Sequence, residues 1–301
     1  MNIKSKLIVA VSSRALFDLD ESHGIFMEDV EKYEAHQKEM QHVPLSKGHA
    51  FHLVEKLLRL NDTPDERTKE KVDAVEVIVV SQNSVKTGRR VSNSIKHYDL
   101  PITRMIFTSG DDPVPYLVNE DLKINLFLSQ RRESVRTALQ NGVPSALIMS
   151  GNKSTDDTQI RIAFDGDNVL FSDESERIFQ EEGLEAFIKH ESENIDKPLN
   201  PGPLIHLFHG ICELKKHFPT KIINALITAR DQPAGDRVFN SFDHWNMHTD
   251  QALLLGGLPK RNFVKAFRAD LFFDDHPKHC TLASEHSATA HVITGVTNEE
   301  Q

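Results

Sequence analysis

The chain has 301 residues, 39% of them hydrophobic and 27% charged, which suits one large or two ordinary globular domains. A formal net charge of −10 argues against a general binder of nucleic acid or anionic membranes, because both need a basic surface. Two cysteines, Cys212 and Cys280, make no disulfide framework and suit a reducing cytoplasm. No apolar segment approaches the ~20 residues that span a bilayer. We therefore expect a cytoplasmic protein with no nucleic-acid or membrane partner, and a homo-oligomer is left open.

The first half of the chain alternates short apolar runs with helical stretches. Leu7–Val11 lacks the length and the cleavage pattern of a signal peptide, and it is predicted to be a strand. Helices are expected at Phe51–Leu60 and Glu133–Gln140. The further predicted strands are Val75–Val80, Arg104–Phe107, Ile124–Leu128 and Ala146–Met149.

The second half has the same pattern, with a helix predicted at Leu204–His217. Its strands are apolar along their whole length, which indicates a parallel sheet covered by helices on both faces. The sequence therefore predicts an α/β protein with doubly wound sheets. The predicted strands here are Ile160–Phe164, Ile222–Ile227, Ala252–Leu255, Asp270–Phe273 and Ala290–Ile293.

An internal repeat relates the two halves. Gly88–Tyr98 matches Gly235–Trp245, with Gly, Arg, Val, Asn, Ser and His recurring in register. Three shorter matches occur in the same order at nearly the same offset, so we predict two homologous modules, residues 1–152 and 153–301, joined near the polar segment Ser150–Gln159. The shorter matches are Asp20–Ser22 with Asp173–Ser175, Pro44–Gly48 with Pro198–Gly202, and Leu126–Gln130 with Leu271–Asp275.

Polar residues follow the strands of the second half, where parallel sheets bind their ligands. Four carboxylates, a hydroxyl with backbone amides and one lysine are expected to meet at one edge of the sheet. In strand order they are Asp165 and Asp167, then Thr228 with Ala229 and Arg230, then Lys260 after Gly256 and Gly257, and finally Asp274 and Asp275.

This set suits phosphoryl transfer, which needs a positioned nucleophile and positive charge around the transferring group. Carboxylates gathered at one edge repel one another, and Mg²⁺ relieves that repulsion while it binds phosphate and water. Lys260 and Thr228 would hold phosphate oxygens. Lys265 is the alternative lysine, but it lies further along a helix, so Lys260 is preferred.

The order Asp-x-Asp, Thr, Lys, Asp-Asp at successive strand ends resembles the haloacid dehalogenase superfamily, whose modules are Rossmann-like. The resemblance implies that Asp165 is the nucleophile and that Asp167 is the general acid and then the base. The second aspartate favours a phosphatase over a dehalogenase. It further implies that Thr228, Ala229 and Lys260 bind phosphate and that Asp165, Asp167 (through its carbonyl), Asp274 and Asp275 bind the metal.

Four segments resemble the cytosolic 5′-nucleotidase type I family more closely. The resemblance implies Mg²⁺-dependent hydrolysis of nucleoside and deoxynucleoside 5′-monophosphates, AMP prominently. Two alternatives stay open: a phosphatase for another small phosphorylated metabolite, and a catalytically silent nucleotide-binding regulator. The segments are Ser13–Leu19, Phe164–Glu176, Ile227–Arg230 and Phe272–Asp275.

A cap and several substrate contacts are also expected. The acidic stretch Asp173–Glu176 and the residues after it predict a small cap insertion at about residues 172–200, following the first motif. Asn168, Phe171 and Arg230 are the candidates for substrate binding. Stacking on a base and core packing are both open for Phe171, and a phosphate contact and a structural salt bridge are both open for Arg230.

The first half keeps the scaffold and lacks the chemistry. Ser12 and Arg14 occupy the positions of Asp165 and Asp167, and no lysine matches Lys260. We therefore predict a non-catalytic module that stabilises its partner. The alternative is that Arg14 and residues 109–112 bind a second nucleotide or help to hold the base. The other replacements are Ser81 for Thr228, and Ser129 and Gln130 for Asp274 and Asp275.

Overall fold

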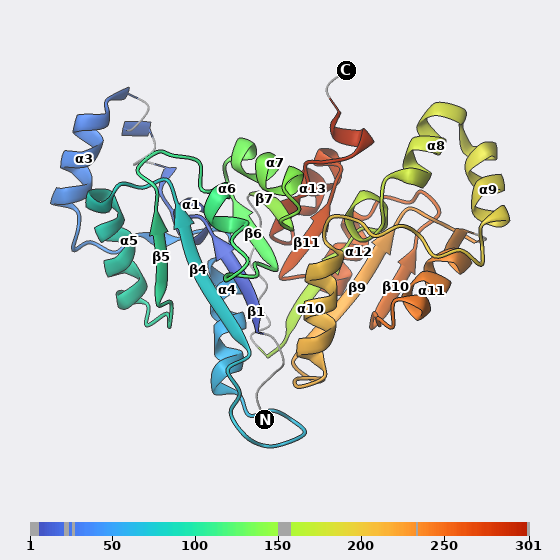
Figure 1. The fold of residues 1–301 in the computed structure, drawn as a ribbon, viewed down its shortest axis with the longest axis horizontal. Helices are drawn as coiled ribbons and strands as arrows, with labels where there is room; N and C mark the ends of the chain where they lie inside the picture. The colour runs from blue at the N-terminus through green and yellow to red at the C-terminus, as the bar shows by residue number, and fades with distance from the viewer. Residues whose placement is uncertain (1–5, 21–23, 26–27, 150–157, 233, 300–301) are drawn as a thin grey trace. The chain divides into compact units, whose positions relative to one another are not determined.

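The computed structural model describes residues 6–20, 24–25, 28–149, 158–232 and 234–299 (Figure 1). The chain forms two compact units, Met1–Val143 and Pro144–Gln301. The predicted boundary between residues 152 and 153, and most of the predicted linker, lie outside the described residues. β7 (Ser145–Met149), which the sequence analysis placed in the first half, pairs antiparallel with β12 (Thr289–His291) of the second unit.

The second unit contains a sheet with the strand order β10-β9-β8-β11-β12-β7, in which only the β12–β7 pair is antiparallel. Within the described residues, its helical elements follow the strands as the sequence predicts. The remaining strands are β8 (Ile160–Phe164), β9 (Ile222–Thr228), β10 (Gln251–Leu254) and β11 (Leu271–Asp274). The helices are α8 (Glu174–Glu182), α9 (Leu184–Glu193), α10 (Ile205–Lys215), α11 (Ala234–His244), α12 (Arg261–Phe267) and α13 (Pro277–Ala283), with short turns η2 (Gly166–Leu170) and η3 (Val296–Asn298).

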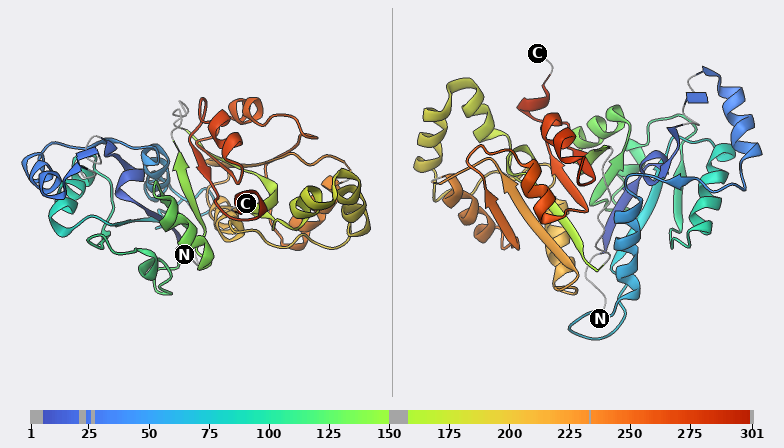
Figure 2. Two further views of the ribbon diagram at one scale, coloured as in Figure 1. Left: turned by 90° about the horizontal axis from the view of Figure 1, so that it is seen from above. Right: turned by 180° about the vertical axis from the view of Figure 1, so that it is seen from behind.

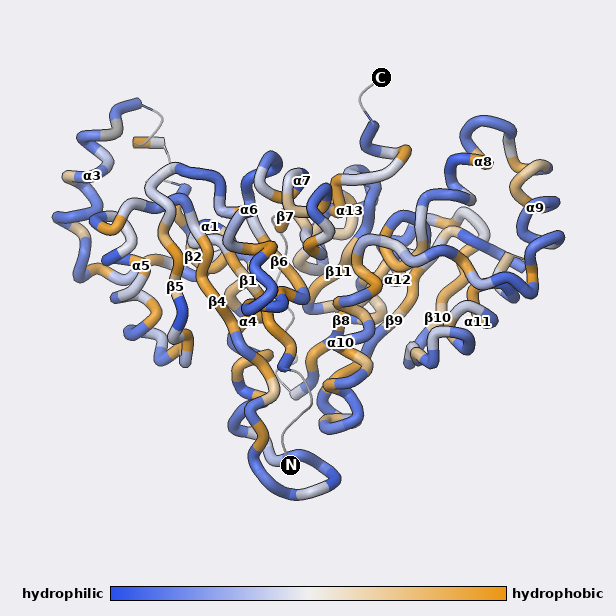
Figure 3. The backbone as a smooth tube through the Cα atoms, viewed as in Figure 1, coloured by the Kyte–Doolittle hydropathy of each residue, from blue (hydrophilic) through white to orange (hydrophobic). Residues whose placement is uncertain are grey.

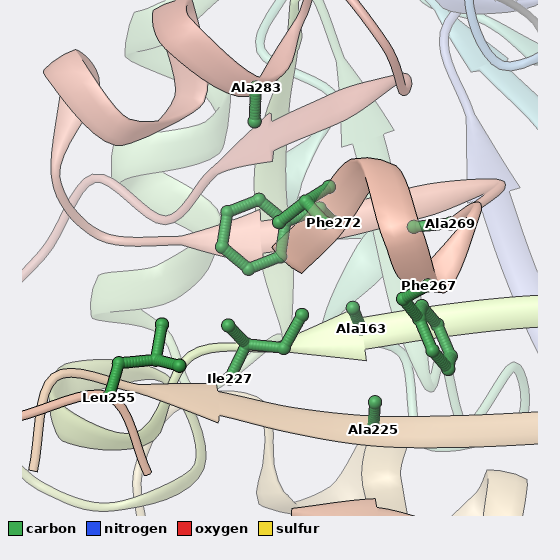
Figure 4. Close-up of a cluster of buried hydrophobic side chains, with 9 residues drawn as sticks. Ala163, Ala225, Ile227, Leu255, Phe267, Ala269, Phe272 and Ala283 are labelled. Carbon is green, nitrogen blue, oxygen red and sulfur yellow. The ribbon is translucent and has the colours of Figure 1, made fainter. Parts of the chain in front are cut away.

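Helices cover both faces of this sheet (Figures 1 and 2). Alternate strand residues point to opposite faces. On one face Ala163 and Phe272 pack with Phe267 of α12 and Ala283 of α13 (Figure 4). On the other face Phe164 meets the ring of Phe208 on α10 edge to face, at 5.4 Å between centroids. The inner strands β8, β9, β11 and β12 are mostly apolar (Figure 3) because both of their faces are buried, whereas the edge strand β10 is partly exposed. This arrangement confirms the predicted doubly wound α/β fold.

The first unit contains a parallel sheet with the order β6-β1-β4-β5. A two-stranded antiparallel ribbon of β2 and β3 accompanies it. The strands are β1 (Leu7–Val11), β2 (Phe17–Asp18), β3 (Ser46–Lys47), β4 (Val75–Ser81), β5 (Arg104–Phe107) and β6 (Leu126–Ser129). The helices are α1 (Ser13–Leu16), α3 (Val30–Glu39), α4 (Phe51–Arg59), η1 (Leu60–Asp62), α5 (Val85–His97), α6 (Val114–Leu117) and α7 (Arg132–Gln140).

The two units share their topology. The order β6-β1-β4-β5 repeats as β11-β8-β9-β10, and the register pairs Leu7 with Val75 in one unit and Ile160 with Ile222 in the other. Side-chain bonds repeat as well. The Nε of Arg90 donates to the carbonyl of Val43, and the Nε of Arg237 donates to that of Lys197, both at 3.0 Å. The sequence repeat therefore preserves the hydrogen bonds that join α5 to the loop before α4 and α11 to the loop before α10.

The predicted cap of residues 172–200 contains the helices α8 and α9. A counterpart is present in the first unit, where α3 (Val30–Glu39) stands at the repeat position of α9 (Leu184–Glu193). The sequence analysis predicted the insertion for the second half alone, because α3 shares little sequence with α9. Within the part of the chain that the structure describes, no helix is long and apolar enough to cross a membrane.

Two equivalent glycines should matter for stability. A Cβ on Gly202 would lie 2.3 Å from the carbonyl oxygen of Phe171, and one on Gly48 would lie 2.8 Å from that of Ala15. Backbone atoms cannot move aside as side chains can. We expect Gly202→Ala to lower the free energy of unfolding by about 1–3 kcal/mol in urea denaturation, as overpacking does. Gly24→Ala, where nothing lies within 4 Å, is the control, and an equal change in both variants would contradict the prediction.

Candidate active site

Asp165 follows β8 directly and has its side chain buried among polar groups. Its carboxylate accepts a hydrogen bond from the backbone N–H of Gly166 at 2.6 Å and lies 2.7 Å from Nζ of Lys260. A Cβ added to Gly166 would lie 3.0 Å from the hydroxyl oxygen of Thr228, so Thr228 is close to the same turn. The structure therefore brings together the ends of β8 and β9 and the lysine after β10.

Three carboxylates form one buried group. Asp165, Asp274 and Asp275 each offer an oxygen atom, and these oxygens lie within 4.8 Å of one another. Lys260 contacts two of the three, at 2.7 Å from Asp165 and 2.8 Å from Asp274. Lys265, the alternative lysine, is exposed. One ammonium group against three ionised carboxylates leaves a net charge of about −2, which a divalent cation with oxygen ligands would balance.

The pKa values reflect this crowding. Burial, together with repulsion from Asp274 and Asp167, raises the pKa of Asp165 to about 7 although Lys260 opposes the rise. Burial and the charge of Asp165 likewise raise the pKa of Asp275 well above its usual value. Burial also acts to raise the pKa of Asp274, but Lys260 and His279 outweigh it and hold that pKa at about 2. Two of the three carboxylates thus ionise with difficulty unless further positive charge is supplied.

Asp167 faces Arg230. Nε and an NH₂ group of Arg230 donate to the two oxygens of Asp167 at 2.9 and 2.6 Å. The same guanidinium also donates to Glu191 on α9. Of the two interpretations of Arg230, the structure therefore contains the salt bridge, and a contact with substrate phosphate stays a prediction.

Asn168 has a role that the sequence analysis missed. Its φ is 55°, and its buried amide donates to Asp275 at 3.2 Å and to the carbonyl of Thr294. The N–H of Phe171 bonds to the carbonyl of Gly166, five residues back, whereas the equivalent N–H of Phe17 bonds to Ser13, four back. The turn after β8 thus holds one extra residue, and such π-type bulges occur often at functional sites.

Phe171 is fully buried, with its ring centroid 6.0 Å from that of Phe242 and 5.9 Å from that of Trp245. Core packing is thus the role that the structure gives it, and stacking on a base would require it to leave this cluster. Phe179 on α8 is 44% exposed and meets Phe187 edge to face.

The corresponding turn of the first unit has different partners. Ser12 caps α1 by accepting from the N–H of Ala15, and the hydroxyls of Ser13 and Ser81 lie 2.8 Å apart. Arg14, in place of Asp167, pairs with exposed Asp20 at 3.1 Å. Among the described residues, the group of Asp165, Asp274 and Asp275 is the one cluster of three possible metal ligands.

The fold and the order of the four strand-end motifs are those of the haloacid dehalogenase type. The 5′-nucleotidase family model matches residues 1–299, and the chain belongs to this family. The chain is 36% identical to human cytosolic 5′-nucleotidase 1B over 287 residues, which make up 92% of this chain and 47% of the relative. The chain thus spans about half the length of that curated relative. The resemblance predicted from the motifs is confirmed.

Proposed function

We propose that this chain is a Mg²⁺-dependent phosphomonoesterase that hydrolyses nucleoside and deoxynucleoside 5′-monophosphates through an aspartyl-phosphate on Asp165. The observation that carries the proposal is the buried group of Asp165, Asp274 and Asp275 with Lys260 between two of them. Family membership and the activity named for the human relative, a 5′-nucleotidase, support the choice of substrate.

The donor set fits Mg²⁺. All side-chain ligands are carboxylate oxygens, and their uncompensated charge matches a divalent hard cation. Asp165, Asp274 and Asp275 would hold the ion, together with the backbone carbonyl of Asp167. When bound, the ion supplies positive charge that offsets the charge of the phosphoryl oxygens.

The residues then divide the reaction into two steps. The carboxylate of Asp165 attacks phosphorus, and the bond from phosphorus to the 5′-oxygen breaks as Asp167 donates a proton to that oxygen. Asp167 next takes a proton from a water molecule that attacks the aspartyl-phosphate, which releases phosphate and restores Asp165. Lys260, the hydroxyl of Thr228 and the backbone N–H of Ala229 hold the phosphoryl oxygens in both steps.

The first unit, in this proposal, is non-catalytic, because Ser12 and Arg14 replace the two carboxyl groups that form the aspartyl-phosphate and transfer the proton. We also propose a cytoplasmic location and a small-molecule nucleotide as the partner, rather than nucleic acid or a membrane. The word cytosolic in the name of the human relative and the two free cysteines support the location. A homo-oligomer remains compatible with the proposal.

The proposal is tested by phosphate release with Mg²⁺ from nucleoside and deoxynucleoside 5′-monophosphates. A 3′-monophosphate of the same nucleoside and a sugar phosphate are the comparison substrates. We expect kcat/KM to favour the 5′-monophosphates by about 10²-fold, the discrimination that a site matched to its substrate's polar groups achieves readily. Equal rates for the sugar phosphate would support the general metabolite phosphatase, and no release from any substrate would support the silent regulator.

A further inference from the structure

A chain of buried charges connects the cap helix α9 to Asp167. The side chain of Glu191 on α9 has no exposed surface, and it contacts Arg230 and Arg237, the latter at 2.9 Å. Ser175 on α8 donates to it as well, at 2.7 Å. Arg230 then holds both oxygens of Asp167. Glu191 is therefore fixed by three partners and fixes the guanidinium that orients Asp167.

Aromatic rings restrict the same guanidinium. The central carbon of Arg230 lies 5.5 Å from the ring centroid of Phe187 on α9 and 5.7 Å from that of Phe171. Arginine is suited to such a position, because its planar group can stack on a ring while its edge donates paired hydrogen bonds. Arg230 has little freedom to turn, so the orientation of Asp167 depends on where α9 places Glu191.

The first unit provides an internal comparison. At the repeat positions of Asp167, Arg230 and Glu191 it has Arg14, Asn83 and Gln37, so all three charges of the chain are changed together. Other buried polar residues are retained. Arg90 matches Arg237, and both bond to the equivalent loop carbonyl at 3.0 Å.

The three replaced residues and the retained arginine therefore have different roles. Since the first unit has the same topology without the three charges, the fold does not require them, whereas it retains the arginine that bonds the loop. Buried ion pairs are also expensive, because desolvation offsets most of their attraction. The replacement of all three residues in the unit that lacks the nucleophile indicates that they serve the chemistry.

We propose that Glu191 and Arg230 are positioning residues that align the carboxyl group of Asp167 for proton transfer to the leaving 5′-oxygen. The inference rests on the proposed function and adds the residues that set the geometry of its acid. In this proposal the predicted cap takes part in the chemical step through Glu191.

The test exploits the leaving group. A nucleoside 5′-monophosphate needs a proton on its departing oxygen, whereas the analogue with sulfur at the bridging 5′ position expels a thiolate. Thiols are far stronger acids than alcohols (the pKa of free cysteine is about 8.5), so the thiolate leaves without a proton. In both cases the bond from Asp165 to phosphorus forms. We expect Glu191→Gln and Arg230→Asn to lower kcat/KM for the oxygen ester by about 10²-fold, the usual contribution of general acid catalysis. The sulfur ester should lose far less.

A double-variant cycle tests the connection. If Glu191 acts through Arg230, Glu191→Gln should cause no further loss in the Arg230→Asn background. The double variant reproduces the Gln37 and Asn83 pair of the first unit, so it removes both charges together and leaves neither of the two unpaired. Glu193→Gln, on the exposed side of α9, is the control and should behave as the wild type.

The possible results are distinct. Equal losses for the oxygen and sulfur esters would mean a structural role and would overturn the inference, as would additive losses in the cycle. A wild-type protein that hydrolyses neither ester, or an Asp165→Asn variant that hydrolyses both, would instead refute the proposed function. Thermal unfolding of each variant shows that the compared proteins are folded.

Discussion

Replacement of Asp165 by asparagine is expected to abolish turnover while the protein remains folded. The amide has nearly the same shape as the carboxylate and can still accept the hydrogen bond from Gly166, which is 2.6 Å long in the structure. It cannot form the acyl phosphate, because its oxygen is a far weaker nucleophile. We expect phosphate release to fall by about 10³-fold or more, as in other enzymes that lose their nucleophile. Mass spectrometry of acid-quenched enzyme should show a phosphorylated wild type and an unmodified variant.

The matched control lies in the first unit. Ser12 occupies the repeat position of Asp165, so Ser12→Ala should leave turnover close to that of the wild type. Its helix cap to Ala15 is lost, which costs about 1 kcal/mol of stability at most positions of this kind. Turnover of Asp165→Asn above about a hundredth of wild type would exclude Asp165 as the nucleophile, since the remaining groups supply only binding and charge.

The sequence was sufficient for the parallel strands and for the residues at their ends, but it did not assign the antiparallel strand β7 to the second unit. Buried parallel strands such as β4 and β9 are apolar along their length, so each is recognisable without its neighbours. Once the strands are assigned, the carboxyl ends of β8 and β11 must lie at one edge, because adjacent parallel strands end on the same side. The grouping of Asp165 with Asp274 and Asp275 follows from that topology. Lys260 could be preferred over Lys265 for the same reason.

The partners of Asp167 could not be found from strand ends. Glu191 lies in an acidic helix with Glu185 and Glu193 nearby, and its charge pattern alone does not say which glutamate is buried. Burial depends on how α9 packs against α11, which brings Arg237 to it. The repeat did contain a signal. In the first unit, glutamine (Gln37) stands at the position of Glu191, whereas the position of Arg237 is again an arginine (Arg90). This difference is recognised only when α3 is aligned with α9.

The extra residue in the turn at Asn168 is a second feature that could not be located from the sequence. The repeat offset is 153 from Leu7 to Ile160 and 154 from Gly48 to Gly202, so one insertion must lie between those points. The numbers do not locate the insertion. Its place follows from the hydrogen bond of Phe171 to Gly166, which encloses one more residue than that of Phe17 to Ser13. A local bulge of this kind depends on the contacts of Asn168 with Asp275 and Thr294, which are distant in sequence.

Magnesium is expected to be required for activity and to stabilise the protein more strongly at neutral than at acidic pH. Burial raises the pKa of Asp165 to about 7, far above its unfolded value, so the folded state binds the extra proton between about pH 4 and 7. Stability without metal should therefore fall as the pH rises through this window. The pKa of Asp274 is lowered to about 2, so Asp274 makes stability rise with pH, but only below about pH 4, outside the range in which Asp165 acts.

A divalent ion binds the ionised carboxylates and reverses that loss. At a concentration of 100 times its Kd, Mg²⁺ should stabilise the fold by about 2.7 kcal/mol, which corresponds to a rise in Tm of roughly 5–10 °C for a domain of this size. Differential scanning calorimetry with and without Mg²⁺ at pH 5.5 and 7.5 measures the effect, and we expect the larger rise at the higher pH. Excess chelator should abolish phosphate release. Asp275→Asn, which removes one oxygen ligand and one charge from the group, should lose most of the Mg²⁺-dependent rise. An equal rise at both pH values, or full activity in chelator, would contradict a magnesium site built from these three carboxylates.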